Sequence, residues 1–192
     1  LDADAVGLGT VAATRWESFD TNINRLGGTP KIYVAQARAF ERAGLGGKQD
    51  DYLMDAGAAD PSSMGIFNLL QRQEFAAVTT AMLDWTPRLR TATKQLEAWD
   101  LDYDVARDVI SSLVDFLKDF LDDYDIAATA TRGAQWRQYV SDLQTLGLTI
   151  LATPGRSSEW IDMTLRRLAN GIYETHRDIL EDIESLTAMG RL

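Results

Sequence analysis

The sequence predicts an all-α fold, an irregular bundle of about six or seven amphipathic helices with no significant sheet. Apolar residues recur at spacings of three and four along most of the chain, as on one face of a helix. No segment alternates apolar and polar residues in the way that a half-buried strand would. Two breaks that begin with proline and one long connection favour an irregular bundle over a simple up-and-down four-helix bundle.

The size and composition of the chain fit a single globular domain. It has 192 residues, of which 45% are hydrophobic, and it contains no cysteine. A chain of this length can bury a sizeable core without disulfides or metal ions, and a cysteine-free chain suits oxidising and reducing compartments alike. We expect an irregular arm over residues 1–12 and one helical domain over 13–192, with a candidate sub-boundary in a loop at 46–63. The first residue is not methionine, so we expect a processed or trimmed chain.

Turn and capping residues predict the helix boundaries in the first half. Glycines 27 and 28 should end a first helix, and Thr29 with Pro30 should cap and start a second one. A further helix is expected to begin near Ser63. Thr86 and Pro87 repeat the threonine–proline signature, so we predict a break or kink there and a separate helix over 87–99.

The second half contains the most regular helical patterns. The segment 104–124 is apolar over a wide face, which predicts a helix that is not peripheral. Another helix should start near residue 132 and stop at Gly147, and residues 148–151 fit either a last helical turn or an extended link. The last helix, 158–186, should be capped by Ser157 or Ser158, and it includes Gly171, where we predict close packing.

The charge balance argues against nucleic acid as a direct partner. The chain has 19 basic and 29 acidic residues, a formal net charge of −10, which opposes binding to phosphate backbones and to anionic membranes. No run of eighteen apolar residues is present, so no membrane span is expected. Arg166, Arg167 and Arg177 alternate with acidic residues, which predicts a salt-bridged helix face.

Four carboxylates at alternating positions resemble part of a calcium-binding loop. Such a loop needs oxygen ligands at its positions 1, 3, 5 and 9, a glycine at position 6 and a glutamate at position 12. Val105 and Ser111 stand where the glycine and the glutamate are needed. The favoured interpretation is therefore that these aspartates cap a helix start, and the weak metal candidates are Asp100, Asp102, Asp104 and Asp108.

A second acidic group lies near the end of the same helix. Like charges four residues apart, close to a helix C-terminus, cost some stability. A basic partner, divalent ions or ambient salt would offset that cost, but an ordinary solvated face is the favoured interpretation. The residues of this acidic patch are Asp115, Asp119, Asp122, Asp123 and Asp125.

No catalytic set emerges from the remaining chemistry-bearing residues. His176 is the sole histidine, and we predict a core or interface histidine; a metal site built from several histidines is impossible. The five tryptophans are expected to pack mainly in the core, with some at a groove or subunit interface. We predict no cofactor and lean against an enzyme; a hydrolase or lyase that uses carboxylates is the weakest alternative.

The last helix provides the main functional hypothesis. Its apolar seam steps by threes and fours, and it fits packing within the domain or against another chain. We therefore expect a non-enzymatic structural or interaction subunit that assembles with itself or with other protein chains, as in a virion, a filament or a large complex. The alternative is an extracytoplasmic helical ligand-binding or sensory domain, with a concave site lined by Arg and Trp. The predicted interface residues are Trp160, Ile161, Leu165, Leu168, Ile172, His176, Ile179 and Ile183.

Overall fold

The computed structural model describes residues 16–46, 61–97, 103–123 and 132–188. Within these ranges the protein is all-α and no sheet is formed, which confirms the predicted fold class. The predicted arm at 1–12 lies outside the described residues, as do residues 47–60 of the loop predicted at 46–63. The end of that predicted loop, 61–63, is instead helical, because the helix expected near Ser63 starts at Pro61. The seven helices are α1 (Trp16–Gly27), α2 (Pro30–Leu45), α3 (Pro61–Leu70), α4 (Gln73–Leu96), α5 (Tyr103–Asp123), α6 (Arg132–Thr145) and α7 (Ser158–Ala188).

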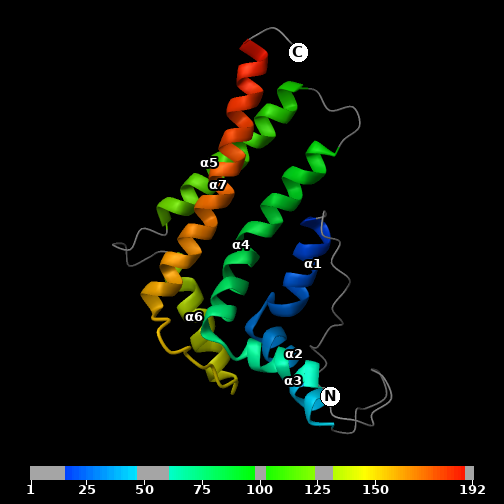
Figure 1. Cartoon of the computed structure of the whole chain (residues 1–192). Coiled ribbons are helices and arrows are strands. Elements are labelled where there is room, and N and C mark those ends of the chain that lie inside the picture. The colour runs from blue at the N-terminus through cyan, green and yellow to red at the C-terminus, as the bar shows by residue number, and fades with distance from the viewer. Residues whose placement is uncertain (1–15, 47–60, 98–102, 124–131, 189–192) are drawn as a thin grey trace.

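Helix α4 runs through the middle of the molecule, and the other helices are arranged around it (Figure 1). Helix α1 lies along one side of α4, while α2, α3 and α6 gather near its N-terminal end. The longest helix, α7, packs mainly against α5. These two helices are antiparallel, because the Tyr103 hydroxyl at the start of α5 donates a hydrogen bond to the Ile183 carbonyl near the end of α7.

Local capping signals in the sequence identify several helix ends correctly. Thr29 caps α2, with its side-chain oxygen accepting a hydrogen bond from the Ile32 amide at 3.3 Å, and Pro30 follows at the first helical position. Ser157 caps α7 in the same way by accepting from the Trp160 amide at 3.2 Å. Gly147 adopts a left-handed conformation with φ of 85° just after α6, as its predicted role as a stop requires.

The predicted helix break at Pro87 is wrong. Helix α4 continues through this proline from Gln73 to Leu96. Thr86 is buried and does not cap a helix: its hydroxyl bonds to the Met82 carbonyl and to Asp20 of α1, both at 2.9 Å. Packing on both sides of Pro87 holds the helix together, although proline forfeits one backbone hydrogen bond.

A break occurs instead at Gln71 and Arg72, where the sequence predicted one continuous helix from Ser63 to Trp85. The Gln71 carbonyl accepts a hydrogen bond from the Leu151 amide at 2.7 Å, and the Gln73 amide donates to the Leu151 carbonyl at 3.1 Å. Residues 148–151 therefore form an extended link rather than a helical turn. This backbone contact separates α3 from α4. No turn or capping residue in 70–73 predicts the break.

The core is centred on α4 and contains large aromatic side chains. Trp85 is fully buried and meets Phe120 of α5 edge to face, with ring centroids 5.1 Å apart. Tyr33 of α2 and Tyr139 of α6 also meet edge to face, at 5.9 Å, and burial raises the pKa of both phenols. Core packing, the favoured role for the tryptophans, is confirmed for Trp85 and Trp136.

Two glycines allow helices to approach closely. A Cβ atom at Gly27 would lie 2.7 Å from Thr79 of α4, and one at Gly44 would lie 2.9 Å from the backbone of Met64 in α3. Gly44 is therefore a packing residue inside α2, and the left-handed Gly46 terminates that helix. The hydroxyl of Tyr139 donates a hydrogen bond to the Gly27 carbonyl at 2.6 Å, so α6 contacts the end of α1 next to this close approach.

Candidate functional site

The predicted seam on α7 divides into two parts. In its first turns, Ile161 and Leu165 are buried inside this chain, together with Ala169, and they belong to the common core. This part of α7 is also held by Asp162, which accepts a hydrogen bond from the Trp136 indole at 2.8 Å and pairs with Arg137 of α6. A partner chain would therefore have to contact the other members of the seam.

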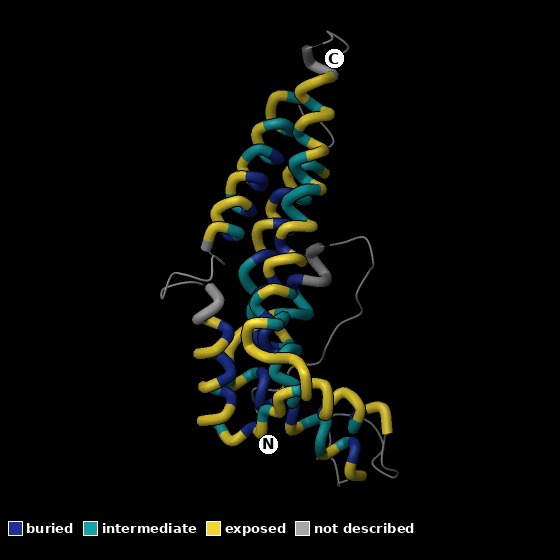
Figure 2. Tube along the Cα trace, turned by 60° about the vertical axis from the view of Figure 1, so that its left-hand side comes forward, coloured by how far each residue is buried: buried dark blue, intermediate teal, exposed yellow. Residues whose placement is uncertain are grey.

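Beyond Ala169, no side chain of α7 is fully buried within the part that the structure describes, which extends to residue 185. Ile172, His176 and Ile183 are half-buried against neighbouring helices, while Ile179 is 42% exposed. Figure 2 shows the consequence: the end of the molecule near the C label has intermediate and exposed positions where the middle has buried ones. The distal half of α7, residues 170–185, thus lies outside the dense core.

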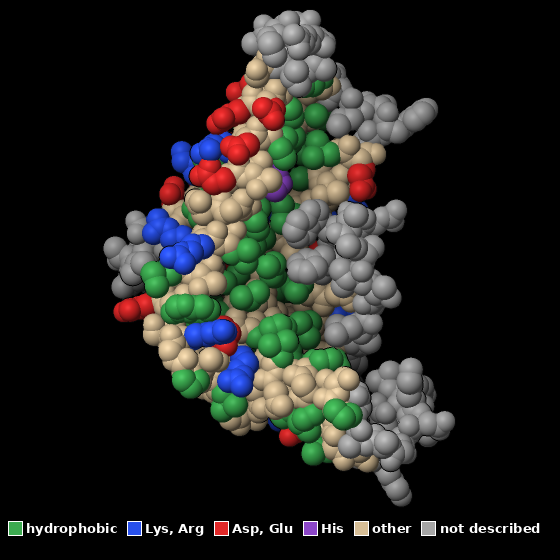
Figure 3. Space-filling model, in the orientation of Figure 1, with side chains coloured by type: hydrophobic (Ala, Val, Ile, Leu, Met, Phe, Trp, Pro, Cys, Tyr) green, Lys and Arg blue, Asp and Glu red, His purple; other side chains and the backbone are tan. Residues whose placement is uncertain are grey.

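Apolar side chains gather on one open face beside this helix. Figure 3 shows them as a strip along the middle of the molecule, in the region between α7 and α4 of Figure 1. Leu168, Ile172, Thr175 and Ile179 are spaced by four, three and four residues, so they share one face of α7, which we name the α7 flank. Leu168 is 38% exposed and Ile179 is 42% exposed. This surface is only partly covered by the chain's own helices.

Gly171 does not have the close packing that the sequence predicted. The helix continues through it, as expected, but a Cβ atom at this position would meet nothing within 4 Å. A glycine in the middle of a helix costs about 1 kcal/mol relative to alanine. No contact among the described residues of this chain offsets that cost.

His176 makes a hydrogen-bond contact within its own helix. Its Nδ1 atom lies 2.7 Å from the Ile172 carbonyl one turn earlier in α7. The residue is half-buried. The core-or-interface role stays a prediction, and within the described ranges its ring has no hydrogen bond to a nucleophilic side chain.

The calcium candidates are only partly described. Asp100 and Asp102 lie outside the described residues, while Asp104 and Asp108 are exposed in the first turns of α5. Both pair with Arg107, at 3.5 and 3.1 Å. Over the ranges that the structure describes, no group of three or more His, Cys, Asp or Glu residues is arranged to hold a metal ion.

The described residues of the acidic patch on α5 are exposed to solvent. Asp115, Asp119 and Asp122 are exposed, and the side chains of Asp123 and Asp125 lie outside the description. The salt-bridged face predicted for α7 exists around Arg177, which pairs with Glu174, Asp178 and Glu181. Arg166 and Arg167 are exposed and have no ion pair with any other described residue.

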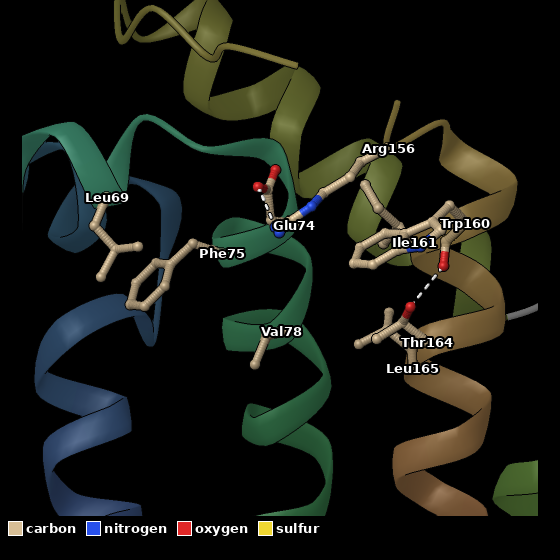
Figure 4. Close-up of a pocket in the computed structure, with 9 residues that line it drawn as sticks. All are labelled: Leu69, Glu74, Phe75, Val78, Arg156, Trp160, Ile161, Thr164 and Leu165. Atoms are coloured by element: carbon tan, nitrogen blue, oxygen red, sulfur yellow. Dashed lines mark hydrogen bonds and ion pairs between the residues drawn. The ribbon is translucent and has the colours of Figure 1, made fainter. Parts of the chain in front are cut away.

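A pocket of about 260 Å³ lies between the beginnings of α4 and α7 (Figure 4). Its walls are mainly apolar and include Phe75 and Val78 from α4 and Trp160 and Leu165 from α7. The guanidinium of Arg156 stacks on the Trp160 ring, 4.9 Å from its centroid. The sequence had suggested a concave site lined by Arg and Trp but had not located it. The complete lining is Leu69, Glu74, Phe75, Val78, Arg156, Trp160, Ile161, Thr164 and Leu165.

Glu74 lines this pocket and is hydrogen-bonded to the turn that precedes α7. Its Oε1 accepts hydrogen bonds from Thr153 at 2.6 Å and from Arg156 at 2.9 Å. Burial alone would raise the pKa of Glu74, but these bonds, its own backbone amide and the Arg156 charge together lower it. Glu74 is therefore ionised at neutral pH, and Arg156 is already paired.

The sequence reasoning missed a buried polar cluster centred on Asp20. Asp20 is 3% exposed, and its carboxylate accepts hydrogen bonds from Thr86 at 2.9 Å, Arg90 at 2.7 Å and Asn24 at 3.1 Å. An aspartate in a short amphipathic helix looks like an ordinary solvated residue. The sequence offers no clear signal for this cluster, because Thr86 before Pro87 has the pattern of a helix cap and its contact with Asp20 is long-range.

Comparisons with known proteins add no assignment: no protein family, no curated protein and no solved structure matches this chain. Among the described helices, none has the length and apolar character needed to cross a bilayer.

Proposed function

We propose that this protein is a non-enzymatic interaction subunit that uses the α7 flank to assemble with copies of itself or with other protein chains. The observation that carries the proposal is the pair of exposed apolar residues, Leu168 and Ile179, on the same face as the half-buried Ile172. Contiguous exposed apolar surface on a folded domain is typical of protein contacts.

The position of the flank supports this proposal. It continues, on the same helix, the seam whose first part is already in the core, so its backbone is held by the fold. A rigid helix that presents apolar side chains at three- and four-residue spacings is the usual form of a helix-mediated contact. The rim of the flank is charged, with Arg167 and Asp182 exposed beside it, as is common around an apolar interface centre.

Site-specific photocrosslinking in the cells that produce the protein tests this function. A photoreactive amino acid at Leu168 or Ile179 is expected to yield discrete higher-mass adducts. The matched control is the exposed Ser141 of α6, where no adduct is expected. Adducts at the control position alone, or none at either α7 position, would overturn the proposed contact surface.

A second candidate function, that of an extracytoplasmic helical ligand-binding or sensory domain, is supported by the pocket between α4 and α7. Its volume of about 260 Å³ suits a small molecule, and its apolar walls carry one stacked Arg–Trp pair at the rim. Because Arg156 is paired with Glu74, an acidic ligand would have to displace that carboxylate. A small apolar or aromatic ligand fits the pocket better.

Ligand-observed NMR with a set of small aromatic compounds tests the second candidate. Binding is expected to weaken on Val78→Trp, which fills the pocket, and to persist in Val105→Trp, a change at an exposed site on α5. A set in which nothing binds, or in which both variants bind equally, would dismiss the pocket as a ligand site.

A further inference from the structure

We infer that the partner of the α7 flank is a second copy of this chain, whose α7 packs antiparallel against it around a two-fold axis near residues 173 and 174. This inference rests on the proposed function and narrows it to one partner and one geometry. Three features of the flank point to this arrangement: the symmetry of its apolar residues, the small residues at its centre and the charges at its edges.

The exposed apolar residues are placed symmetrically. Leu168 and Ile179 lie at equal distances on either side of the position between 173 and 174, about 16 Å apart along the helix axis. A two-fold axis at that position brings Leu168 of one copy against Ile179 of the other, at both ends of the contact. A contact between identical surfaces requires this kind of self-complementarity.

Small residues occupy the centre of the flank. Gly171 and Thr175 are one turn apart on the same side of α7, both are exposed, and a Cβ at Gly171 would enter open space. Around the proposed axis, Gly171 of one copy is level with the turn that contains Thr175 in the other. Small residues at a helix crossing let two backbones approach closely, which gives the otherwise costly glycine a role.

The edge charges are complementary in the antiparallel arrangement. Arg167 is exposed without an ion pair among the described residues, and Asp182 is likewise exposed and unpaired there. The same axis places Arg167 of one copy at the level between Asp178 and Asp182 of the other. In a parallel arrangement Arg167 would be level with the other Arg167 instead of with Asp178 and Asp182, so this complementarity would be lost. Charge pattern at an interface chiefly determines orientation and partner choice.

Disulfide trapping in the full chain tests the orientation, and the absence of native cysteine leaves no background. Thr175→Cys lies close to the proposed axis and is expected to form a disulfide-linked dimer under mild oxidation. Ile179→Cys, on the same exposed face of α7, would lie about 16 Å along the helix axis from its equivalent in the antiparallel pair and would meet it only in a parallel pair, so it should stay unlinked. Efficient linkage through residue 179, or none through residue 175, would overturn the antiparallel contact.

Charge reversal measured by sedimentation equilibrium tests the pairing. We expect Arg167→Glu, and separately the double change Asp178→Arg with Asp182→Arg, to raise the dimer dissociation constant at least about tenfold at low salt. Combining all three changes in one chain should restore association. Gly171→Ala should also weaken the dimer without unfolding the monomer. Loss of association in the combined variant would contradict the proposed pairing.

The outcome for the unmodified chain separates this inference from the proposed function. A chain that remains monomeric up to about 1 mM overturns the second copy as partner. If photocrosslinking at Leu168 then still yields adducts to a different protein, the interaction function stands and only the partner is wrong. A monomer that gives no adducts overturns both.

Discussion

The two halves of α7 have similar apolar patterns and very different surroundings. Ile161 and Leu165 in the first half are 2% and 1% exposed, whereas Ile179 in the distal half is 42% exposed. The first half belongs to the common core and is hydrogen-bonded to α6 through Asp162, while the distal half lies outside that core with α5 as its main neighbour (Figure 1). An amphipathic pattern therefore identifies a face that can be buried, and the number of neighbouring helices decides whether it is.

The difference also separates residues that hold the fold from residues available for contact. Substitutions in the enclosed region should lower the free energy of unfolding strongly. Substitutions on the α7 flank should change association while leaving the fold nearly intact.

Removal of the central indole should have the largest effect. Trp85→Ala is expected to lower the free energy of unfolding by about 4 kcal/mol, because it leaves a large cavity beside Phe120. The matched change on the flank, Ile179→Ala, should cost less than about 1 kcal/mol in the monomer, since that side chain is already 42% exposed. Urea denaturation of dilute samples measures both, and equal losses would refute the division.

The buried polar cluster should come next. Asp20→Ala leaves Thr86 without one partner and Arg90 without its carboxylate, so we expect a loss of about 3 kcal/mol. Asp182→Ala, at an exposed and locally unpaired position, is the control and should change monomer stability by less than about 0.5 kcal/mol. Thermal denaturation followed by circular dichroism provides the comparison. A control as damaging as Asp20→Ala would argue against the cluster.

The contact between α4 and the turn before α7 should have a smaller, pH-dependent effect. The Glu74 pKa is lowered from its ordinary value of 4.5, so its contribution to stability is present above that pH and is lost as pH falls through the folded-state pKa. Glu74→Gln is expected to cost on the order of 1 kcal/mol at pH 7. The difference between the two proteins should shrink below pH 4.5, as urea denaturation at several pH values would show. A constant difference would exclude ionisation as its cause.

Gly171→Ala should have the smallest effect, and it should be favourable for the monomer. Nothing lies within 4 Å of the added carbon, so the substitution is expected to stabilise the dilute chain by about 0.5–1 kcal/mol. A clear destabilisation of the monomer would mean that Gly171 is in close contact within the chain after all. Differential scanning calorimetry at low concentration is the appropriate measurement.

Local chemistry explains which parts of the fold were predictable. Thr29 with Pro30, Ser157 and Gly147 act through the backbone within a few residues of themselves, so their sequence signals identified real helix ends. Pro87 was misinterpreted because its local preference for a break is overridden by the burial of Trp85 and Thr86 around it. The break at Arg72 was missed for the opposite reason, since it depends on Leu151, far away in the sequence.

The sequence by itself determined the helical class, several of the helix ends and the apolar faces, because helix periodicity and capping are short-range properties. Only the tertiary structure decided which part of each face is covered. It placed Asp20 beside Thr86, brought Arg156 and Trp160 to the edge of a pocket, and left Leu168 and Ile179 exposed. These outcomes depend on contacts between segments far apart in the chain, and such contacts produce no regular residue spacing from which they could be predicted.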